Sequence, residues 1–440
     1  MILILINVLD YIYYHDRFYP GIFIGNTYIG NKRYNEVRSL LEDTFNALKK
    51  NEIVFLQENK ELLSLTCTDA GIFASVEDTL QKTLMMGRFR LFGKISAGDP
   101  LTRISLLIHK YHAQKEIMLD NDLFSAMMTT LASRCMVLPK NAYFEPQNDH
   151  VNICPEKTGQ YLKATATREN IIRALEEHGK KDKPSADRVN VEVVTGGWPP
   201  AATAMELDEM GVKEKISSFS TSISPGNANR THNIMLASSV LDGYILAPQE
   251  TFSFNEIIGA ATRADGYKEA PIISGGKLVP GVGGGLCQVS STLYNNALLA
   301  SLKIIERHNH SLPVGYVSLG RDATIAHDYL DLKFENSLDD YLMIDAEVKN
   351  NRLVIQFYSR KNEMEVQIIS TNKVQIPAPI VMEKDKNMEP GNIKIVQKGT
   401  PGYRITTWRL FLQDGSEIGR EKLSDDYYKP KPFIYRAAPE

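Results

Sequence analysis

The amino-acid sequence predicts an α+β multidomain protein with two small α+β repeats, a mixed α+β domain and a small all-β C-terminal module. The first observation is length, because 440 residues far exceed the roughly 150 of an average domain. The second is an internal repeat in the N-terminal part. The third is a change near Ser217 to short strands and loops rich in Ser, Thr and Gly. Hydrophobic residues at 43% and charged residues at 23% are typical of globular proteins, so each part can bury a core.

The N-terminal segment, residues 1–18, is apolar as far as Tyr14 but is interrupted by Asn7 and Asp10. It is shorter than the roughly 20 residues that span a bilayer, and no basic residue precedes it as in a signal peptide. Two interpretations stay open. The segment is either the outer end of a membrane anchor whose upstream part is missing from this chain, or a buried first strand.

Two N-terminal stretches share one pattern of short strand, glycine turn and amphipathic helix, at residues 61–87 and 149–179. In the second copy we expect the helix to have Thr167 as its N-cap and to end at Gly179. Ile171, Ile172 and Leu175 form its apolar stripe. The pattern predicts two related α+β modules.

The two modules are expected at residues 19–100 and 101–180. A further helix over residues 35–50 is expected to pack on the first module's sheet. Its apolar positions at helical spacing are Val37, Leu40, Leu41, Phe45 and Leu48. These positions are predicted core.

Residues 181–216 are predicted to be a linker. A charged, hinge-like segment covers residues 179–184, and a Gly-Gly-Trp-Pro-Pro interruption covers residues 196–200. Both are clusters of residues that break regular structure.

The domain at residues 217–360 is expected to end in a β-hairpin with its turn at Asn350-Asn351. The tail, residues 361–440, is expected to be an all-β module. Asp414-Gly415 between two apolar runs is a strong signal for a tight hairpin turn there.

Charge and cysteine content exclude several classes of protein. Lys+Arg 50 and Asp+Glu 53 leave a net charge of −3, so nothing favours nucleic acid as the main partner. The four cysteines are too few and too scattered for a disulfide framework, and none has Cys-x-x-Cys zinc spacing. The glycine-rich segment lacks both the Walker Lys-Ser/Thr and the dinucleotide spacing, and we expect no cofactor.

The segment that most strongly suggests a reactive site is the glycine loop at residues 281–285, which runs directly into a helical pattern. Cys287 falls at or just before that helix's N-terminus. Unpaired N–H groups and the positive end of the helix dipole favour a thiolate there, and glycines let backbone amides approach an oxyanion. Cys287 is therefore a candidate nucleophile. The alternative is a tight strand-to-helix turn with Cys287 as a small buried apolar residue.

A cysteine nucleophile needs a base, and the next segment offers His308, His310, Asp322 and Asp328. If residues 304–311 form a strand, both imidazoles face one side. Three interpretations stay open. One is a Cys-His-Asp relay, in which one His takes the thiol proton and one Asp orients it. The second is a metal site made of both His and an acidic residue. In the third, the histidines only bond loop carbonyls.

Candidate ligand-binding residues surround the glycine loop. Backbone amides near Gly285 to Gln288 could stabilise an oxyanion. Arg230 and Asn233 could bind a polar ligand, or cap a helix expected over residues 233–241. The complete set of predicted ligand-binding residues is Gly284, Gly285, Gln288, Ser291, Arg307, Arg321 and Arg230. Arg321 can equally form a structural pair with Asp322.

The region from Phe219 to Tyr358 resembles the VanW domain, named for an accessory protein of vancomycin B-type resistance clusters. The matching segments are residues 248–255, 283–295, 307–314 and 320–324. The repeated modules resemble the YoaR-like peptidoglycan-binding domain, including the opening at residues 19–25. The tail is similar to the five-glycine (G-five) module of cell-surface proteins, with glycines at 391, 399, 402 and 415.

The resemblance implies an extracytoplasmic protein at the cell surface of Gram-positive-type bacteria, with peptidoglycan or another wall glycan or peptide as its partner. Members usually carry an N-terminal signal or membrane anchor, and this chain departs from them in having only the short apolar run.

Two functions stay open. One is Cys-dependent acyl transfer or hydrolysis on stem peptides, with a cysteine leading into a helix as in cysteine L,D-transpeptidases. The other is non-catalytic wall binding or scaffolding. The first predicts a reachable Cys287 with a lowered pKa and a His nearby, and the second predicts an enclosed, inert thiol.

Overall fold

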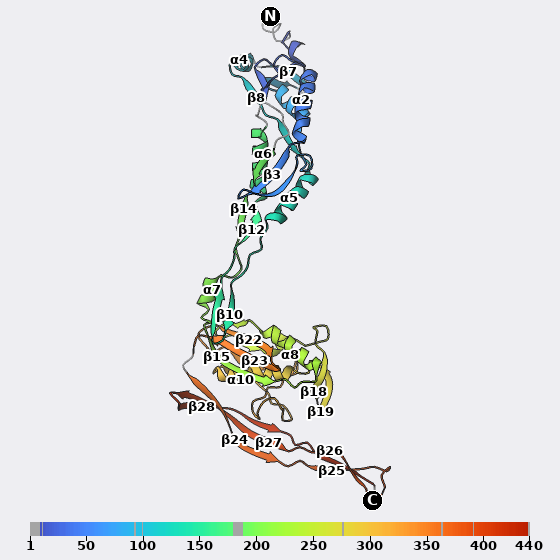
Figure 1. Ribbon diagram of the computed structural model, residues 1–440, viewed down its shortest axis with the longest axis vertical. Coiled ribbons are helices and arrows are strands. Elements are labelled where there is room, and N and C mark those ends of the chain that lie inside the picture. Colours follow the sequence, from blue (N-terminus) through green and yellow to red (C-terminus); the bar gives the residue numbers. More distant parts are fainter. Residues whose placement is uncertain are drawn as a thin grey trace. The chain divides into compact units, whose positions relative to one another are not determined.

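The structure is a computed structural model that describes residues 9–10, 12–91, 94–98, 100–178, 188–274, 277–361, 364–389 and 391–438 (Figure 1). The chain forms two compact units. The first contains residues 1–140 and 157–201, and the second contains residues 141–156 and 202–440. Helices and strands occur in both units, which confirms the α+β multidomain class.

The N-terminal repeat is visible as a repeated order of elements. The first copy consists of β1 (Ile22–Ile24), β2 (Thr27–Tyr28), α2 (Tyr34–Lys49), β3 (Glu52–Gln57), β4 (Lys60–Thr66), β5 (Ile72–Ser75) and α3 (Val76–Leu84). The second copy consists of β8 (Tyr111–Ala113), β9 (Glu116–Leu119), α5 (Asn121–Cys135), β10 (Tyr143–Gln147), β11 (His150–Cys154), β12 (Gly159–Leu162) and α6 (Ala164–His178). Between them lie β6 (Arg88–Leu91), β7 (Lys94–Gly98) and α4 (Pro100–Ile108).

Several strands of the first unit pair across the two copies. β1 runs parallel to β8, and β5 runs antiparallel to β9. Two later strands complete the small sheets: β13 (Arg188–Glu192) is parallel to β3, and β14 (Thr195–Trp198) is antiparallel to β12. Both lie in the range 181–216 that the sequence suggested as a linker. The alternating Val189 and Val191 are buried there, which is the pattern of a half-buried strand. The expected hinge at residues 179–184 lies outside the described residues.

Three of the five predicted core positions of helix α2 are buried, and Leu48 is half-buried. Val37, Leu41 and Phe45 are buried at i, i+4, i+8 spacing and belong to the first unit's apolar cluster around β1. Leu40, predicted as core, is 45% exposed, because it lies off this stripe. A second cluster joins α5 and α6 to β3 and β13.

Helix α6 begins earlier than the sequence suggested. It starts at Ala164, and Thr167, expected as the N-cap, is buried inside it. Its hydroxyl accepts a hydrogen bond from the Val194 N–H at 3.0 Å, so it bonds a neighbouring segment and not its own helix end. Ile171 and Leu175 are buried as predicted. The expected helix end at Gly179 lies outside the described residues.

Part of the N-terminal segment can be compared with its two interpretations. Residues 1–8 and 11 lie outside the described residues, and residues 9–10 and 12–14 are helical. The interpretation as a buried strand is therefore wrong for this part, where Ile12 is 61% exposed. None of the helices described in the structure combines the length and apolar character needed to cross a bilayer.

The second unit is built on a six-stranded sheet in the order β10-β11-β15-β23-β22-β16. Its elements before the tail are α7 (Ala204–Glu209), β15 (Glu214–Ser222), α8 (Ala228–Leu241), β16 (Tyr244–Leu246), β17 (Thr251–Ser253), α9 (Phe254–Ile258), β18 (Glu269–Ser274), β19 (Lys277–Val282), α10 (Leu286–Leu299), β20 (Lys303–Glu306), β21 (Lys333–Glu335), β22 (Leu342–Lys349) and β23 (Arg352–Ser359). β22 and β23 form the predicted hairpin, and Asn350 and Asn351 have φ of 52° and 57°, as its tight turn requires.

Helix α10 is buried on nearly all sides, between the sheet and the loops that follow it. Its polar side chains are satisfied by neighbouring elements. Thr292 Oγ1 lies 2.9 Å from Thr221 Oγ1, and Asn296 Nδ2 donates to the Ile355 carbonyl at 2.8 Å. Both bonds go to adjacent strands of the sheet, β15 and β23, so they hold the helix that carries Cys287 against the sheet.

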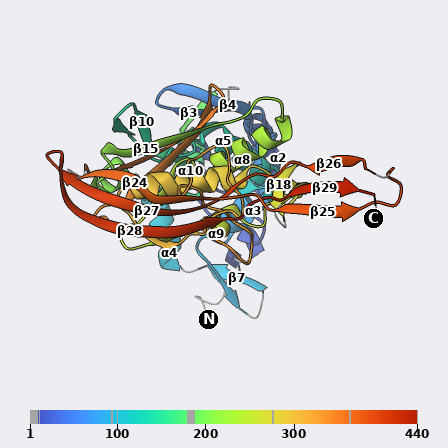
Figure 2. The same ribbon diagram turned by 90° about the horizontal axis from the view of Figure 1, so that it is seen from below.

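The tail is all-β, as predicted. It contains β24 (Glu365–Ile376), β25 (Ile380–Lys384), β26 (Ile393–Gln397), β27 (Gly402–Gln413), β28 (Ser416–Tyr428) and β29 (Phe433–Ala437). β27 and β28 join at the expected Asp414-Gly415 turn. Figure 2 shows the long strands β24, β27 and β28 passing along α10, and buried Arg409 donates to the Leu302 carbonyl at 2.7 Å just after that helix.

Candidate functional site

Cys287 is the second residue of α10, at the helix start that the sequence predicts. The loop before it turns through Gly283 and Gly285, whose φ of 79° and 116° lie in the left-handed region favoured by glycine. At Gly284 a Cβ would lie 2.7 Å from the backbone of Ala270, so this position must stay small. The glycines thus allow the close packing that sets the first turn of α10.

Cys287 is half-buried as a residue. Its Sγ lies 3.8 Å from Thr324 Oγ1 and 3.8 Å from the Ile325 carbonyl oxygen. The imidazole of His310 also acts on the thiol and lowers its pKa by hydrogen bonding and by charge. Cys287 and His310 are therefore brought together, although 22 positions separate them in the sequence.

His310 is held by Asp322. Its Nδ1 lies 2.6 Å from Asp322 Oδ2, and its backbone N–H donates to the same oxygen at 2.7 Å. Because Nδ1 faces the carboxylate, Nε2 is the ring nitrogen left to exchange a proton with Cys287. Among the predicted arrangements, the cysteine, histidine and aspartate of the relay are the groups that the fold assembles.

Asp322 is completely buried and has four kinds of donor. Besides His310, Arg307 Nη2 donates to its Oδ1 at 3.3 Å, and the Tyr428 hydroxyl donates to the same oxygen. Arg307 also donates to Asp426 at 2.6 Å. A buried carboxylate is stable only with such partners, so the network keeps Asp322 ionised.

The electrostatics favour a thiolate–imidazolium pair. Burial alone would raise the pKa of Cys287, but the hydrogen bond and charge of His310 outweigh it and the thiol's pKa is lowered. Burial alone would lower the pKa of His310, but Asp322 and Cys287 together raise it to about 9. Burial opposes ionisation of Asp322 as well, but His310 and Arg307 keep its pKa lowered.

His308, the other predicted base, lies elsewhere. The strand expected over residues 304–311 ends at Glu306, so the two histidines do not share a strand face. His308 Nε2 lies 3.1 Å from Glu306 Oε1. Asp328 pairs weakly with His327 at 3.5 Å, outside the Asp322 network.

The expected helix at residues 233–241 begins five residues earlier, at Ala228, with Asn227 as its N-cap. Asn233 therefore caps nothing: its side chain is buried and bonds the backbone of Lys268 and Gly284. Asn233 thus holds the glycine loop in place through its bond to the Gly284 carbonyl. As for the metal-site alternative, the described residues contain no group of three or more His, Cys, Asp or Glu that could hold a metal ion.

The predicted ligand-binding residues separate into two groups. Gln288 and Ser291 are buried and bond their own surroundings: Gln288 bonds β15, and Ser291 bonds the backbone of Ala323. Arg307 holds Asp322, as described above. The guanidinium of Arg321 donates to Asn295 Oδ1 and lies over the ring of Phe219, and it does not pair with Asp322 as the structural alternative proposed.

The remaining predicted residues, Gly284, Gly285 and Arg230, lie at the N-terminus of α10. The Arg230 side chain passes over the glycine loop and reaches Gln288.

Two tyrosines at the site were not singled out from the sequence. The ring of Tyr316 lies edge-on to His310, with the ring centroids 6.5 Å apart. Its position two residues after the Leu-Pro-Val run of the histidine segment is the one signal that could have indicated it. Tyr428 comes from the tail, and no local pattern connects it with Asp322.

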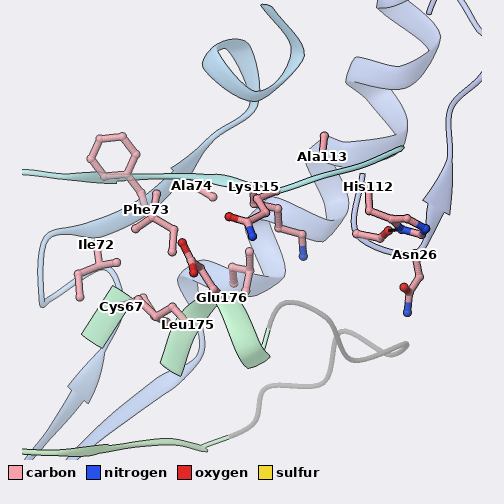
Figure 3. Close-up of a pocket in the computed structure, with 14 residues that line it drawn as sticks. Asn26, Cys67, Ile72, Phe73, Ala74, His112, Ala113, Lys115, Leu175 and Glu176 are labelled. Atoms are coloured by element: carbon pink, nitrogen blue, oxygen red, sulfur yellow. Dashed lines mark hydrogen bonds between the residues drawn. The ribbon is translucent and has the colours of Figure 1, made fainter. Parts of the chain in front are cut away.

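Two cavities lie outside this relay. One, of about 370 Å³, lies in the first unit; Figure 3 shows Ile72, Phe73 and Leu175 on its wall together with His112 and Lys115. The other, of about 420 Å³, is in the second unit and has a polar lining that includes Glu256, Glu306, His327, Asp331 and Lys333.

Known families and proteins match most of the chain. Residues 229–358 match the family described as "VanW like protein", residues 368–436 match the "G5 domain", and residues 98–183 match the "Putative peptidoglycan binding domain". The family resemblances inferred from the sequence motifs are confirmed by these matches.

The chain is 34% identical over 273 residues to YoaR of Bacillus subtilis, covering 62% of this chain and 84% of YoaR. It is 31% identical over 152 residues to the vancomycin B-type resistance protein VanW of Enterococcus faecalis, covering 33% of this chain and 55% of that protein. Among solved structures, the G5 domain of IgA1 protease is 20% identical with a TM-score of 0.15, covering 18% of this chain and 95% of that one. The chain thus belongs to the VanW-like family of proteins that includes YoaR.

Proposed function

We propose that the domain at residues 217–360 is a cysteine-dependent acyltransferase or hydrolase that acts on the stem peptides of peptidoglycan. The observation that carries the proposal is the Cys287–His310–Asp322 relay, in which the half-buried residue Cys287 lies at a helix N-terminus and its thiol has a lowered pKa. In this proposal the modules at 19–100 and 101–180, together with the tail, hold the protein to the cell wall outside the membrane.

The reaction begins with attack of the Cys287 thiolate on a peptide carbonyl carbon. The S–C bond forms and the carbonyl electrons move to oxygen. The Leu286 and Gln288 N–H groups already donate to the Gly283 and Gly285 carbonyls. Other N–H groups at the start of α10, such as that of Cys287, stabilise the oxyanion. As the oxyanion collapses, the C–N bond breaks and the amine leaves with a proton from His310 Nε2. Asp322 keeps the imidazole oriented and stabilises its cationic form.

The second half of the reaction releases the acyl group from the thioester. Water or the amine of a second stem attacks the thioester carbonyl while His310 accepts the proton, and the C–S bond breaks to restore the thiolate. Water gives hydrolysis, and an amine gives a new peptide cross-link. The proposed substrate class rests on the peptidoglycan-binding family match of residues 98–183 and on the similarity to VanW.

The direct test is to look for the acyl-enzyme. The protein is incubated with purified muropeptides, quenched in acid and measured by intact-protein mass spectrometry and peptide mapping. We expect an adduct on the peptide that contains Cys287, with a mass equal to a stem peptide less its leaving group. Cys287→Ala should remove the adduct, and Cys154→Ala should keep it, because Cys154 is partly exposed but lies beside Glu145 and not beside an imidazole.

The proposal is wrong if the wild-type protein forms no adduct and leaves the muropeptides unchanged while still binding them. That result would identify a wall-binding protein whose polar cluster only fixes its loops.

A further inference from the structure

The side chain of Arg230, on α8, crosses the N-terminus of α10 on both sides of the nucleophile. Its Cγ would lie 3.2 Å from a Cβ placed on Gly285, two residues before Cys287. At its other end, Nη2 donates to Gln288 Oε1 at 2.7 Å, one residue after Cys287. The Arg230 side chain therefore spans the first turn of α10 from Gly285 to Gln288, the turn that carries Cys287.

The position of this guanidinium is fixed by a second layer of bonds. Gln288 is buried, and its Nε2 donates to Thr221 Oγ1 at 2.9 Å and to the Ser222 carbonyl at 3.0 Å. These two bonds orient the amide so that Oε1 faces Arg230. The bond to Gln288 uses one of the five N–H donors that a guanidinium carries.

Arg230, like Arg321 with Asn295, has a neutral hydrogen-bond partner, whereas two other inward-facing arginines of this unit pair with carboxylates. Arg307 pairs with Asp322 and Asp426, and Arg409 pairs with Glu421. Within the described chain, no carboxylate forms an ion pair with Arg230; the charged or ionisable groups acting on it are Tyr316 and Cys287. A half-buried cation without an anionic partner is costly unless an anion binds to it.

Tyr316 is a neighbour of His310, the residue that acts on the Cys287 thiol. Its ring stands edge-on to His310, and burial raises its pKa, so the phenol stays a hydrogen-bond donor at neutral pH. A guanidinium and a phenol next to a nucleophile can both donate to one carboxylate, and a guanidinium does so in a planar, two-point geometry.

We propose that Arg230, together with Tyr316, binds the free C-terminal carboxylate of the peptide that Cys287 attacks. This inference rests on the proposed function. One residue spans about 3.5 Å, so a carboxylate held next to Cys287 places the preceding peptide carbonyl at the thiol. The scissile bond is then the last peptide bond of the stem, and the leaving group is a single amino acid.

The test compares two synthetic stem tetrapeptides that differ only in the C-terminus, a free carboxylate or a carboxamide. For the wild-type protein we expect kcat/KM for the carboxylate to be about 10- to 100-fold higher, the range of a charge-assisted hydrogen bond. Arg230→Gln should bring the ratio close to one, mainly through KM, and Arg230→Lys should keep part of it. The control is Arg263→Gln, an exposed arginine of the same domain that pairs with Glu269 and should keep the full ratio.

An Arg230→Gln protein that is folded and still prefers the carboxylate overturns the inference. If the wild type turns over neither peptide, the proposed function fails, and binding decides the inference separately. In calorimetry with Cys287→Ala protein, tighter binding of the carboxylate peptide that is lost with Arg230→Gln supports carboxylate recognition. Equal binding of both peptides, or binding of neither, contradicts it.

Discussion

The hydroxyl of Tyr428, near the end of β28 in the tail, donates a hydrogen bond to Oδ1 of Asp322, 106 residues earlier in the sequence. The same hydroxyl accepts a hydrogen bond from the Gly320 N–H at 2.8 Å. Both Tyr428 and Asp322 are fully buried. The five-glycine-type tail therefore contributes a side chain, Tyr428, to the set of groups that hold the Asp322 carboxylate next to His310.

Removing this hydroxyl should weaken the whole unit. Tyr428→Phe leaves the Gly320 N–H buried without its acceptor and removes one donor from Asp322. We expect a loss of about 1–3 kcal/mol in the free energy of unfolding, measured by urea titration. Tyr427→Phe is the matched control, since Tyr427 is 42% exposed and should cost little. Equal losses for the two variants would contradict the role given to Tyr428.

The lowered pKa of Cys287 predicts alkylation at unusually low pH. A thiol with a lowered pKa is already thiolate above that pKa, and His310, with a pKa of about 9, stays protonated beside it throughout the neutral range. The rate of iodoacetamide labelling should therefore stay high well below the free-thiol value of about 8.5. It is measured against pH in a variant in which Cys67, Cys135 and Cys154 are replaced.

The same measurement with His310→Ala should move the labelling midpoint upward, because burial then acts on the thiol without the opposing imidazolium. A thiol that reacts only after the protein unfolds would show that Cys287 is a structural residue.

The two neighbouring histidines should differ in function. His310→Ala removes the proposed acid and base, and turnover of muropeptides should fall by about 10²- to 10⁴-fold. His308→Ala removes a side chain paired with Glu306 and should change turnover only a few-fold. Rates are followed by chromatography of the products, and similar losses in both variants would argue against the assigned roles.

The glycine loop should not tolerate a methyl group at Gly284. In Gly284→Ala the new Cβ meets the Ala270 backbone at 2.7 Å, so the loop and the first turn of α10 must shift. We expect slower labelling of Cys287 and a lower melting temperature. Gly315→Ala serves as the control, because no atom lies within 4 Å of its Cβ position. If Gly284→Ala labels at the wild-type rate, the loop does not set the position of the thiol.

Local sequence patterns were sufficient to locate two hairpin turns and the helix N-terminus that carries Cys287. The alternation of apolar residues indicated the β22–β23 hairpin, with Asn350-Asn351 in its turn, and Asp414-Gly415 indicated the tail hairpin. The glycine run before an apolar helix placed Cys287 at a helix N-terminus. These features depend on the residues' own φ preferences and on the spacing of neighbours along the chain, so the sequence alone is sufficient to predict them.

The tertiary structure decided how distant segments meet. Spacing left open whether His308 or His310 is the proposed base, and the fold favours His310 because the strand ends at Glu306 and buried Asp322 binds both the ring and the backbone of His310. The pairing of β13 with β3, which gives structure to a range that looked like a linker, joins segments more than 130 residues apart. Such contacts form because buried polar groups and open strand edges must find partners, and no local pattern specifies which distant partner satisfies them.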